Sequence, residues 1–422
     1  MRYFHLTNCK VLIRIMEKIM KKKLICLLAL LIISCMTFTS CITSMFGEAG
    51  ITQKPEVTQR PLPGDITTSE DTGASDEPVF GSKPSYSSIK LADHVKVDYK
   101  GITIETDSIP PEITDKVLTA NLAAMFDYYK ASGDIDCSYT LLTEGVVEEW
   151  DYVEISFVGK LDGEVFEGGS STANVGMIVN DHDSGYIPGF ASGIIGAKVG
   201  ETVNVPVTFP TNYNEALAGK EAVFEITVYG KRVFDIKDEH IEKLTGGDYK
   251  NLSDFMVYYK EYLSDLYESD LLSSVSDKIA EAIIANATVY SYPNEQYLYY
   301  YQSNVSYMTL QAEKLGMTYE AYMTATGENE ETLRATAERS VLEDMAIYYI
   351  LEAEGKSYTD DEYNKALDYY IEYYNSYGYN YDRKSIEAMF EYYYYPGYLR
   401  YQLNRERAIQ IVFDSANIVE AK

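Results

Sequence analysis

The chain has 422 residues, of which 46% are hydrophobic and 13% aromatic, so it is long enough for two or three domains with sizeable cores. Its formal net charge of −29 argues against a nucleic-acid partner, because phosphate contacts require Lys and Arg side chains. A strongly acidic surface keeps a protein in solution and repels anionic membrane, but it does not specify a partner.

The amino terminus has the pattern of an export signal. Three lysines, at 21–23, precede an apolar run over residues 24–36, which is shorter than the roughly 20 residues that a membrane-spanning helix needs. We favour a lipoprotein signal over residues 1–41 that ends at Cys41, with Cys35 as the alternative lipid site and Met20 as an alternative start. An uncleaved anchor is the other interpretation. Two segments resemble a bacterial lipobox: Phe38-Thr39-Ser40-Cys41 and Ile32-Ile33-Ser34-Cys35.

Cysteine usage agrees with this interpretation. Of the five cysteines, Cys9, Cys26 and Cys35 would leave with the signal, and Cys41 would carry the lipid. Cys137 would then be alone, so no intramolecular disulfide is expected. It is either a reactive thiol or a half-buried bystander, and we favour the bystander.

Residues 42–88 are rich in Thr, Ser, Pro, Gly and acidic residues. They lack the apolar content that would offset the entropy of ordering, so we predict a disordered tether. The tether would hold a folded body away from a membrane surface.

Residues 89–145 are predicted to form a β-hairpin and a helix that connect the tether to the next domain. Apolar residues alternate over 95–104, and Lys100-Gly101 offers a turn. Pro110-Pro111-Glu112 is predicted to open the helix. Apolar residues recur there at helical spacing: Val117, Leu118, Leu122, Met125 and Phe126.

Residues 146–233 are predicted to be rich in β-structure. Asp162-Gly163 is a hairpin signal. Residues 203–209 and 222–228 alternate as half-buried strands do, and Pro206 indicates an edge position or a bulge.

Residues 234–422 are predicted to be helical. Thirty-one of the 41 tyrosines fall between Tyr249 and Tyr401, and runs such as Tyr392–Tyr395 cannot all face inward on a helix. Some tyrosines must therefore line an exposed surface or a cleft. The predicted helices cover residues 251–287, 294–315, 319–324, 330–353, 360–377 and 384–413.

The β-rich segment carries a series of motifs in a fixed order: Asp162-Gly163-Glu164-Val165-Phe166-Glu167-Gly168-Gly169, Ile187-Pro188-Gly189-Phe190, Thr208-Phe209-Pro210 with Tyr213, and Leu217-Ala218-Gly219-Lys220 with Phe224. This order resembles the FKBP-type peptidyl-prolyl isomerase domain, in the version found in trigger factors. The resemblance implies an α+β fold, with an FKBP-like antiparallel β half-barrel and short helix followed by an all-α chaperone domain. The ribosome-docking domain of trigger factors is expected to be replaced by the signal and tether.

The resemblance also implies which residues line a pocket. Phe190 would form the floor under a prolyl ring, and Ile187 would supply a main-chain hydrogen bond. Tyr213 would donate its hydroxyl to a substrate carbonyl, and Glu167 would be the acidic pocket residue. The implied set is Phe157, Phe166, Glu167, Ile187, Phe190, Tyr213, Leu217 and Phe224.

A pocket of this kind suits rotation about a peptide bond, which needs no acid, base, nucleophile, metal or cofactor. Residues 174–184 depart from the family pattern, and we expect a polar, mobile element there beside the pocket. His182 between Asp181 and Asp183 could be a metal-ligand set, but a solvated turn is the favoured interpretation.

The hypothesis from sequence is an isomerase and chaperone for exported proteins, lipid-anchored on the extracytoplasmic face of the cell membrane. Its partners would be unfolded or newly exported polypeptides with X-Pro bonds, with no nucleic acid and no ribosome docking. The tyrosines would offer a broad contact surface to such chains. The alternatives are a holdase without isomerase activity and a glycan-binding surface lipoprotein.

Overall fold

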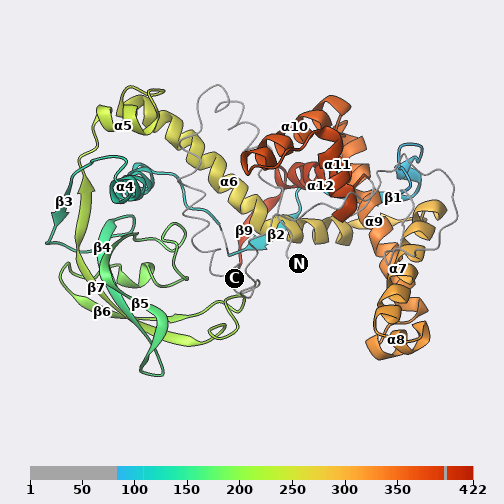
Figure 1. Ribbon diagram of the computed structural model, residues 1–422, viewed down its shortest axis with the longest axis horizontal. Helices are drawn as coiled ribbons and strands as arrows, with labels where there is room; N and C mark the ends of the chain where they lie inside the picture. The colour runs from blue at the N-terminus through green and yellow to red at the C-terminus, as the bar shows by residue number, and fades with distance from the viewer. Residues whose placement is uncertain (1–82, 108, 394–396, 422) are drawn as a thin grey trace. The chain divides into compact units, whose positions relative to one another are not determined.

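The computed structural model describes residues 83–107, 109–393 and 397–421, which group into two compact units (Figure 1). Residues 109–271 are built around a β-sheet and are called the sheet unit. Residues 83–107 and 272–421 are called the helical unit. A sheet region followed by a mainly helical region confirms the predicted α+β class.

Five antiparallel strands form the sheet. Hydrogen bonds order four of them β3-β7-β4-β5, and β6 pairs with β7. The long strand β7 therefore contacts three partners and is the centre of the unit. The strands are β3 (Tyr139–Leu142), β4 (Tyr152–Leu161), β5 (Glu164–Ile178), β6 (Thr202–Thr208) and β7 (Glu221–Phe234).

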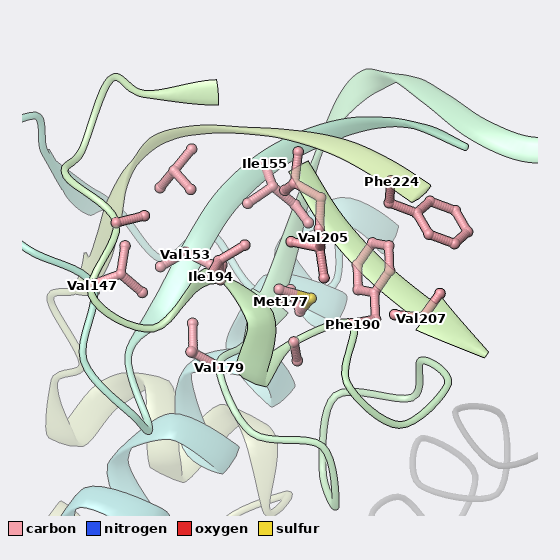
Figure 2. Packing of buried hydrophobic residues seen from close by; sticks show 14 of the residues in the cluster. Val147, Val153, Ile155, Met177, Val179, Phe190, Ile194, Val205, Val207 and Phe224 are labelled. Atoms are coloured by element: carbon pink, nitrogen blue, oxygen red, sulfur yellow. The ribbon is translucent and has the colours of Figure 1, made fainter. Parts of the chain in front are cut away.

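The core of the sheet unit follows the two-residue period of its strands. β7 buries Phe224, Ile226 and Val228, and their neighbours in the strand are more exposed. Figure 2 shows Val147 at one end of the buried cluster and the rings of Phe190 and Phe224 at the other. Each such side chain contributes roughly 1.5–3 kcal/mol when fully buried, so the cluster is a main source of the stability of the sheet unit.

Two local sequence predictions in the sheet are confirmed. Asp162 and Gly163 adopt φ of 51° and 85°, and they join β4 to β5 through the pair Leu161–Glu164. This is the conformation that a two-residue hairpin requires. Pro206 lies in β6, which pairs only with β7 among the described strands, so the proline occupies an edge position.

Helix α4 (Asp115–Ser132) begins later than predicted. Its N-cap is Thr114, whose side chain accepts a hydrogen bond from the Val117 N–H at 3.4 Å, and it ends at Gly133 with φ 81°. The prediction of a start at Pro110-Pro111-Glu112 was wrong, because the hydroxyl of Thr114 caps the helix by accepting from one of the free N–H groups of its first turn.

The sheet unit continues past its last strand. Helix α5 (Asp238–Leu244) and the first part of α6 (Leu252–Ala285) bury Ile241, Leu244 and Phe255 against Phe126 of α4. The predicted boundary after residue 233 therefore differs from the structure, which groups residues up to 271 with the sheet. The reason is that the strands cover only the face of α4 with Ala120 and Ala123, and the face with Phe126 is covered by α5 and α6.

The helical unit contains the rest of α6 and further helices. The range 384–413 is mainly helical as predicted, but it forms two helices, α11 and α12, rather than one. Gly397 adopts a left-handed φ of 79°, and α12 begins after it. No helix in the described ranges is both long and apolar enough to cross a membrane. The helices are α7 (Asn294–Lys314), α8 (Tyr319–Thr326), α9 (Glu330–Glu354), α10 (Asp360–Ser376), α11 (Arg383–Tyr393) and α12 (Tyr398–Phe413).

The predicted hairpin within residues 89–145 was also wrong. Strand β1 (Val95–Val97) pairs antiparallel with β8 (Ala287–Val289), and β2 (Thr103–Thr106) pairs in parallel with β9 (Asn417–Glu420). Gly101 does make a turn, with φ 70°. An isolated two-stranded hairpin is only marginally stable, and these strands gain more by pairing where the helices bury their apolar side chains.

The predicted tether extends too far along the chain. Lys83 forms an ion pair of 2.9 Å with Asp344 of α9, and Tyr86 is 6% exposed and stacks on Tyr348. Residues 83–88 are therefore part of the helical unit. The predicted signal, both lipobox cysteines and the rest of the tether lie outside the described residues.

The tyrosines of the helical unit divide between core and surface. Tyr363 and Tyr370 are buried, whereas Tyr307, Tyr377 and Tyr379 are 52%, 69% and 56% exposed. The prediction that some tyrosines face outward is confirmed. The side chains of the run 392–395 lie outside the described part of the chain.

Arg232, near the end of β7, joins the sheet to α4. Its guanidinium donates to Asp127 of α4 at 2.7 Å and to Glu154 of β4 at 2.9 Å, and its side chain is only 8% exposed. Burial alone would raise the pKa of Glu154, but hydrogen bonds from Asn174, Arg232 and Tyr139 hold that pKa below its ordinary value. Loss of the cation would leave the buried carboxylate of Glu154 and the half-buried one of Asp127 uncompensated.

We predict that Arg232→Met lowers the free energy of unfolding of the sheet unit by about 3–5 kcal/mol, the usual cost of breaking a buried pair. Urea unfolding followed by the fluorescence of Trp150, the single tryptophan of the chain, measures this change. The control is Lys116→Met, whose partner Glu148 lies 3.0 Å away with both side chains about two-thirds exposed (66% and 65%). That variant should have a much smaller effect on stability, because solvent screens an exposed ion pair. Equal effects of the two variants would contradict the prediction.

Candidate functional site

Aromatic rings from three strands and from the loop that carries Phe190 meet at one end of the core of the sheet unit, where Figure 2 shows Phe190 and Phe224. The ring of Phe190 lies 5.2 Å from that of Phe157 of β4 and 5.0 Å from that of Phe224 of β7, both edge to face. Phe166 of β5 lies 6.0 Å from Phe224. The structure thus brings together four of the rings that the sequence resemblance implied, although they are far apart in the chain.

Two glycines in the strands make room for the ring of Phe166. A Cβ on Gly159 would lie 2.6 Å from Phe224 Cε1 and 2.8 Å from Phe166 Cε1, and one on Gly169 would lie 2.4 Å from Phe166 Cζ. Sequence reasoning did not single out Gly159. The available signal was a glycine inside a strand with no turn nearby. Such a glycine often marks a place where another part of the protein packs closely against the backbone.

The loop between β6 and β7 forms one side of the site. Its base is closed by two hydrogen bonds: the Phe209 N–H donates to the Lys220 carbonyl at 2.9 Å, and the Phe209 carbonyl accepts from the Gly219 N–H at 3.0 Å. Leu217 is half-buried against the aromatic cluster. Tyr213 packs on Phe209 with ring centroids 4.9 Å apart and is 44% exposed. Its hydroxyl makes no hydrogen bond to any described residue, so it is available to an incoming group.

Ile187 offers a second unused donor. Its carbonyl accepts from the Phe190 N–H at 3.1 Å, but its own N–H has no hydrogen-bond acceptor in the described ranges. The side chain is half-buried against the aromatic cluster. Glu167 is exposed. The implied pocket residues therefore provide an apolar cluster together with a free main-chain N–H and a free hydroxyl.

Phe190 itself is covered in this structure. Only 1% of it is exposed, and the ring of Tyr186 stacks on it with centroids 4.4 Å apart and an interplanar angle of 11°. A ligand would meet Tyr186 before it met Phe190. Sequence reasoning missed Tyr186, although an aromatic residue immediately before Ile187-Pro188-Gly189-Phe190 was the signal available.

The loop that precedes these residues is anchored rather than free, which corrects the expectation of a mobile element. Asp181 accepts from the N–H groups of Gly189 and Ser192, each at 3.0 Å, and from the Ser192 hydroxyl at 2.6 Å. The two acidic residues of the predicted solvated turn thus serve as acceptors that hold the loop. No group of His, Cys, Asp and Glu side chains suited to a metal ion occurs among the described residues.

Asp183 anchors the same loop to two helices. It accepts from Asn121 of α4 at 2.7 Å and from the hydroxyl of Tyr267 of α6, and His182 Nδ1 lies 2.5 Å from its second oxygen. Burial alone would raise the pKa of Asp183, but these hydrogen bonds hold it below its ordinary value. The carboxylate form is therefore the one that keeps the loop in place.

Cys137 is the one cysteine within the described residues, and it is fully buried. Burial raises the pKa of its thiol, which disfavours the reactive thiolate. The structure supports the bystander interpretation.

Comparison with known proteins gives a family match over the segment that contains this site. Residues 144–229 match the family of FKBP-type peptidyl-prolyl cis-trans isomerases. The chain is 28% identical over 286 residues to the trigger factor of Streptococcus mutans, and this alignment covers 66% of this chain and 64% of that protein. It is 30% identical over 285 residues to the trigger factor of Halothermothrix orenii, covering 64% and 62%. The chain is trigger-factor-like.

The sequence matches cover only part of each relative. The chain spans less than two thirds of each of these relatives, 64% and 62%. A solved structure described as "Promiscuous Substrate Recognition in Folding and Assembly Activities of the Trigger Factor Chaperone" aligns with a TM-score of 0.33 and 14% identity, over 76% of this chain and 73% of that one. With so low a TM-score, the fold conclusion rests on the strands and helices of this chain.

We predict that Gly159→Ala lowers the free energy of unfolding of the sheet unit by about 1–3 kcal/mol, the usual cost of overpacking. The new methyl group would lie 2.6 Å from the carbonyl oxygen of Gly169, a backbone atom that cannot move aside. Urea unfolding monitored through Trp150 measures the loss. Ser170→Ala, at an exposed position of β5, should change stability by less than about 0.5 kcal/mol. A Gly159→Ala variant as stable as that control would show that Phe166 is not confined by the glycine.

Proposed function

We propose that the sheet unit catalyses cis–trans isomerisation of peptide bonds that precede proline. The observation that carries this proposal is an aromatic cluster flanked by two unused donors, the Ile187 N–H and the Tyr213 hydroxyl. The match of residues 144–229 to the isomerase family supports it. The proposed site residues are Phe157, Phe166, Glu167, Ile187, Phe190, Tyr213, Leu217 and Phe224.

The chemistry follows from the amide bond. Rotation is opposed by about 18–20 kcal/mol, because the planar form is stabilised by resonance. In the twisted state the bond loses double-bond character and charge separation, so an apolar environment that excludes water favours it over the planar state. Because no covalent bond is made or broken, the aromatic cluster needs no acid, base or nucleophile.

The two donors would position the substrate. In our proposal the Ile187 N–H holds a peptide carbonyl and fixes the chain on one side of the rotating bond. The Tyr213 hydroxyl, on the opposite loop, donates to another carbonyl. Holding both sides of the bond lets the apolar cluster act on the twisted form.

We further propose that the helical unit binds unfolded polypeptides and presents them to the isomerase site. Its exposed tyrosines, Tyr307, Tyr377 and Tyr379 among them, offer large contact areas with a polar tip. Loose capture in the same chain raises the local concentration of X-Pro bonds at the site. Such an unfolded client is the proposed partner.

We also propose that the protein is exported and held by lipid at the extracytoplasmic face of the membrane. The support is the sequence alone: the lysines before an apolar run, followed by Phe38-Thr39-Ser40-Cys41. A single lipid chain binds membrane only marginally, whereas a lipoprotein amino terminus with several chains binds stably.

A proline-limited refolding assay tests the isomerase proposal. The full chain should accelerate refolding, and Tyr213→Phe should lower kcat/KM by about 2- to 10-fold, the effect of losing one neutral hydrogen bond of about 0.5–1.5 kcal/mol. Tyr229→Phe is the matched control, because Tyr229 of β7 pairs with Ser156 at 3.0 Å and points away from the core. It should leave activity unchanged.

The assay also separates the alternatives. No acceleration by the wild type would refute the isomerase proposal. If the same protein still suppressed aggregation of the client, a holdase without isomerase activity would be the better description.

The anchor proposal predicts that Cys41→Ser abolishes incorporation of labelled fatty acid in a bacterial host and releases the protein from the membrane fraction. Cys35→Ser is the matched control and should retain both label and location. Label lost with Cys35→Ser would move the lipid site there. The absence of label in the wild type would refute the anchor.

A further inference from the structure

The ring of Tyr186 covers the residue that the family resemblance places at the floor of the pocket. Its centroid lies 4.4 Å from that of Phe190 at an interplanar angle of 11°, and 5.7 Å from that of Phe157 at 88°. Phe190 is left 1% exposed, whereas Tyr186 is half-buried. The accessible aromatic surface at this end of the core therefore belongs to Tyr186.

The backbone that carries Tyr186 is held on both sides. Its own N–H donates to the Ser184 hydroxyl at 3.2 Å. Three residues further on, the Gly189 N–H donates to Asp181 at 3.0 Å. Asp183 is bound in turn by Asn121 of α4 and by Tyr267 of α6. Moving Tyr186 away from Phe190 by a shift of the loop would break several of these bonds.

Two roles are open to such a residue. As a lid, Tyr186 would leave Phe190 when substrate arrives, and its removal would help binding. As a platform, it would remain in place and contact the substrate, and its removal would harm binding. The anchored loop and the stacked geometry favour the platform, because a preorganised surface needs no rearrangement before it binds.

We propose that Tyr186 is a substrate-contacting residue of the isomerase site, with Phe190 supporting its ring from beneath. This inference rests on the isomerase function proposed above. The hydroxyl of Tyr186 has no hydrogen-bond partner among residues whose positions the structure describes. It is therefore a third donor, beside the Ile187 N–H and the Tyr213 hydroxyl, that can meet a peptide carbonyl.

The test measures both binding and turnover of a short prolyl peptide by the full chain. Tyr186→Ala should raise the dissociation constant and KM by about tenfold or more, since the contact surface is lost. Tyr186→Phe keeps the ring and should raise them by about 2- to 10-fold, the effect of one hydroxyl. Tyr229→Ala, a tyrosine on the outer side of β7, is the control and should change neither.

Each other result has a definite meaning. Equal or tighter binding by Tyr186→Ala, with Tyr213→Phe still impaired, would overturn the platform and leave the isomerase function standing. A wild type that neither binds nor isomerises the peptide would refute both. If Tyr186→Ala unfolds, as Trp150 fluorescence would reveal, Tyr186→Leu keeps most of the volume and must show the same weakened binding.

Discussion

The buried guanidinium of Arg232 is the interaction on which the geometry of the sheet unit depends. It neutralises Asp127 of α4 and Glu154 of β4 from its place at the end of β7, so helix and sheet are locked to one another. The same helix α4 carries Asn121, which binds Asp183 in the loop before the aromatic site. Helix α4 therefore links the end of the sheet, through Asp127, to the loop before the aromatic site, through Asn121.

The aromatic site beside that loop contains no reactive group, and the chemistry proposed for it depends on shape and rigidity. The rings of Phe157, Phe166 and Phe224 are fixed by packing, with glycines in the strands making the necessary space. A rotation catalyst works by favouring one conformation of the bound peptide over another. Anchored walls with a few free donors suit that task better than a flexible pocket.

The sheet unit is inserted in the chain between the two parts of the helical unit. Residues before it supply β1 and β2, and residues after it supply β8 and β9, their partners. Lys83 likewise reaches the buried carboxylate of Asp344, far away in the sequence. The helical unit is therefore completed only when both ends of the described chain come together.

The amino-acid sequence by itself determined the fold class, the hairpin at Asp162-Gly163, the restriction of Pro206 to an edge position or a bulge, and most helix positions. These features depend on neighbours in the chain: a periodicity, a turn that needs positive φ, a missing N–H. The order of motifs also identified the rings that converge. Only the tertiary structure decided that β1 and β2 do not pair with each other, and that Tyr186 lies over Phe190. Those outcomes depend on which distant surfaces bury one another, and no local pattern specifies the partner.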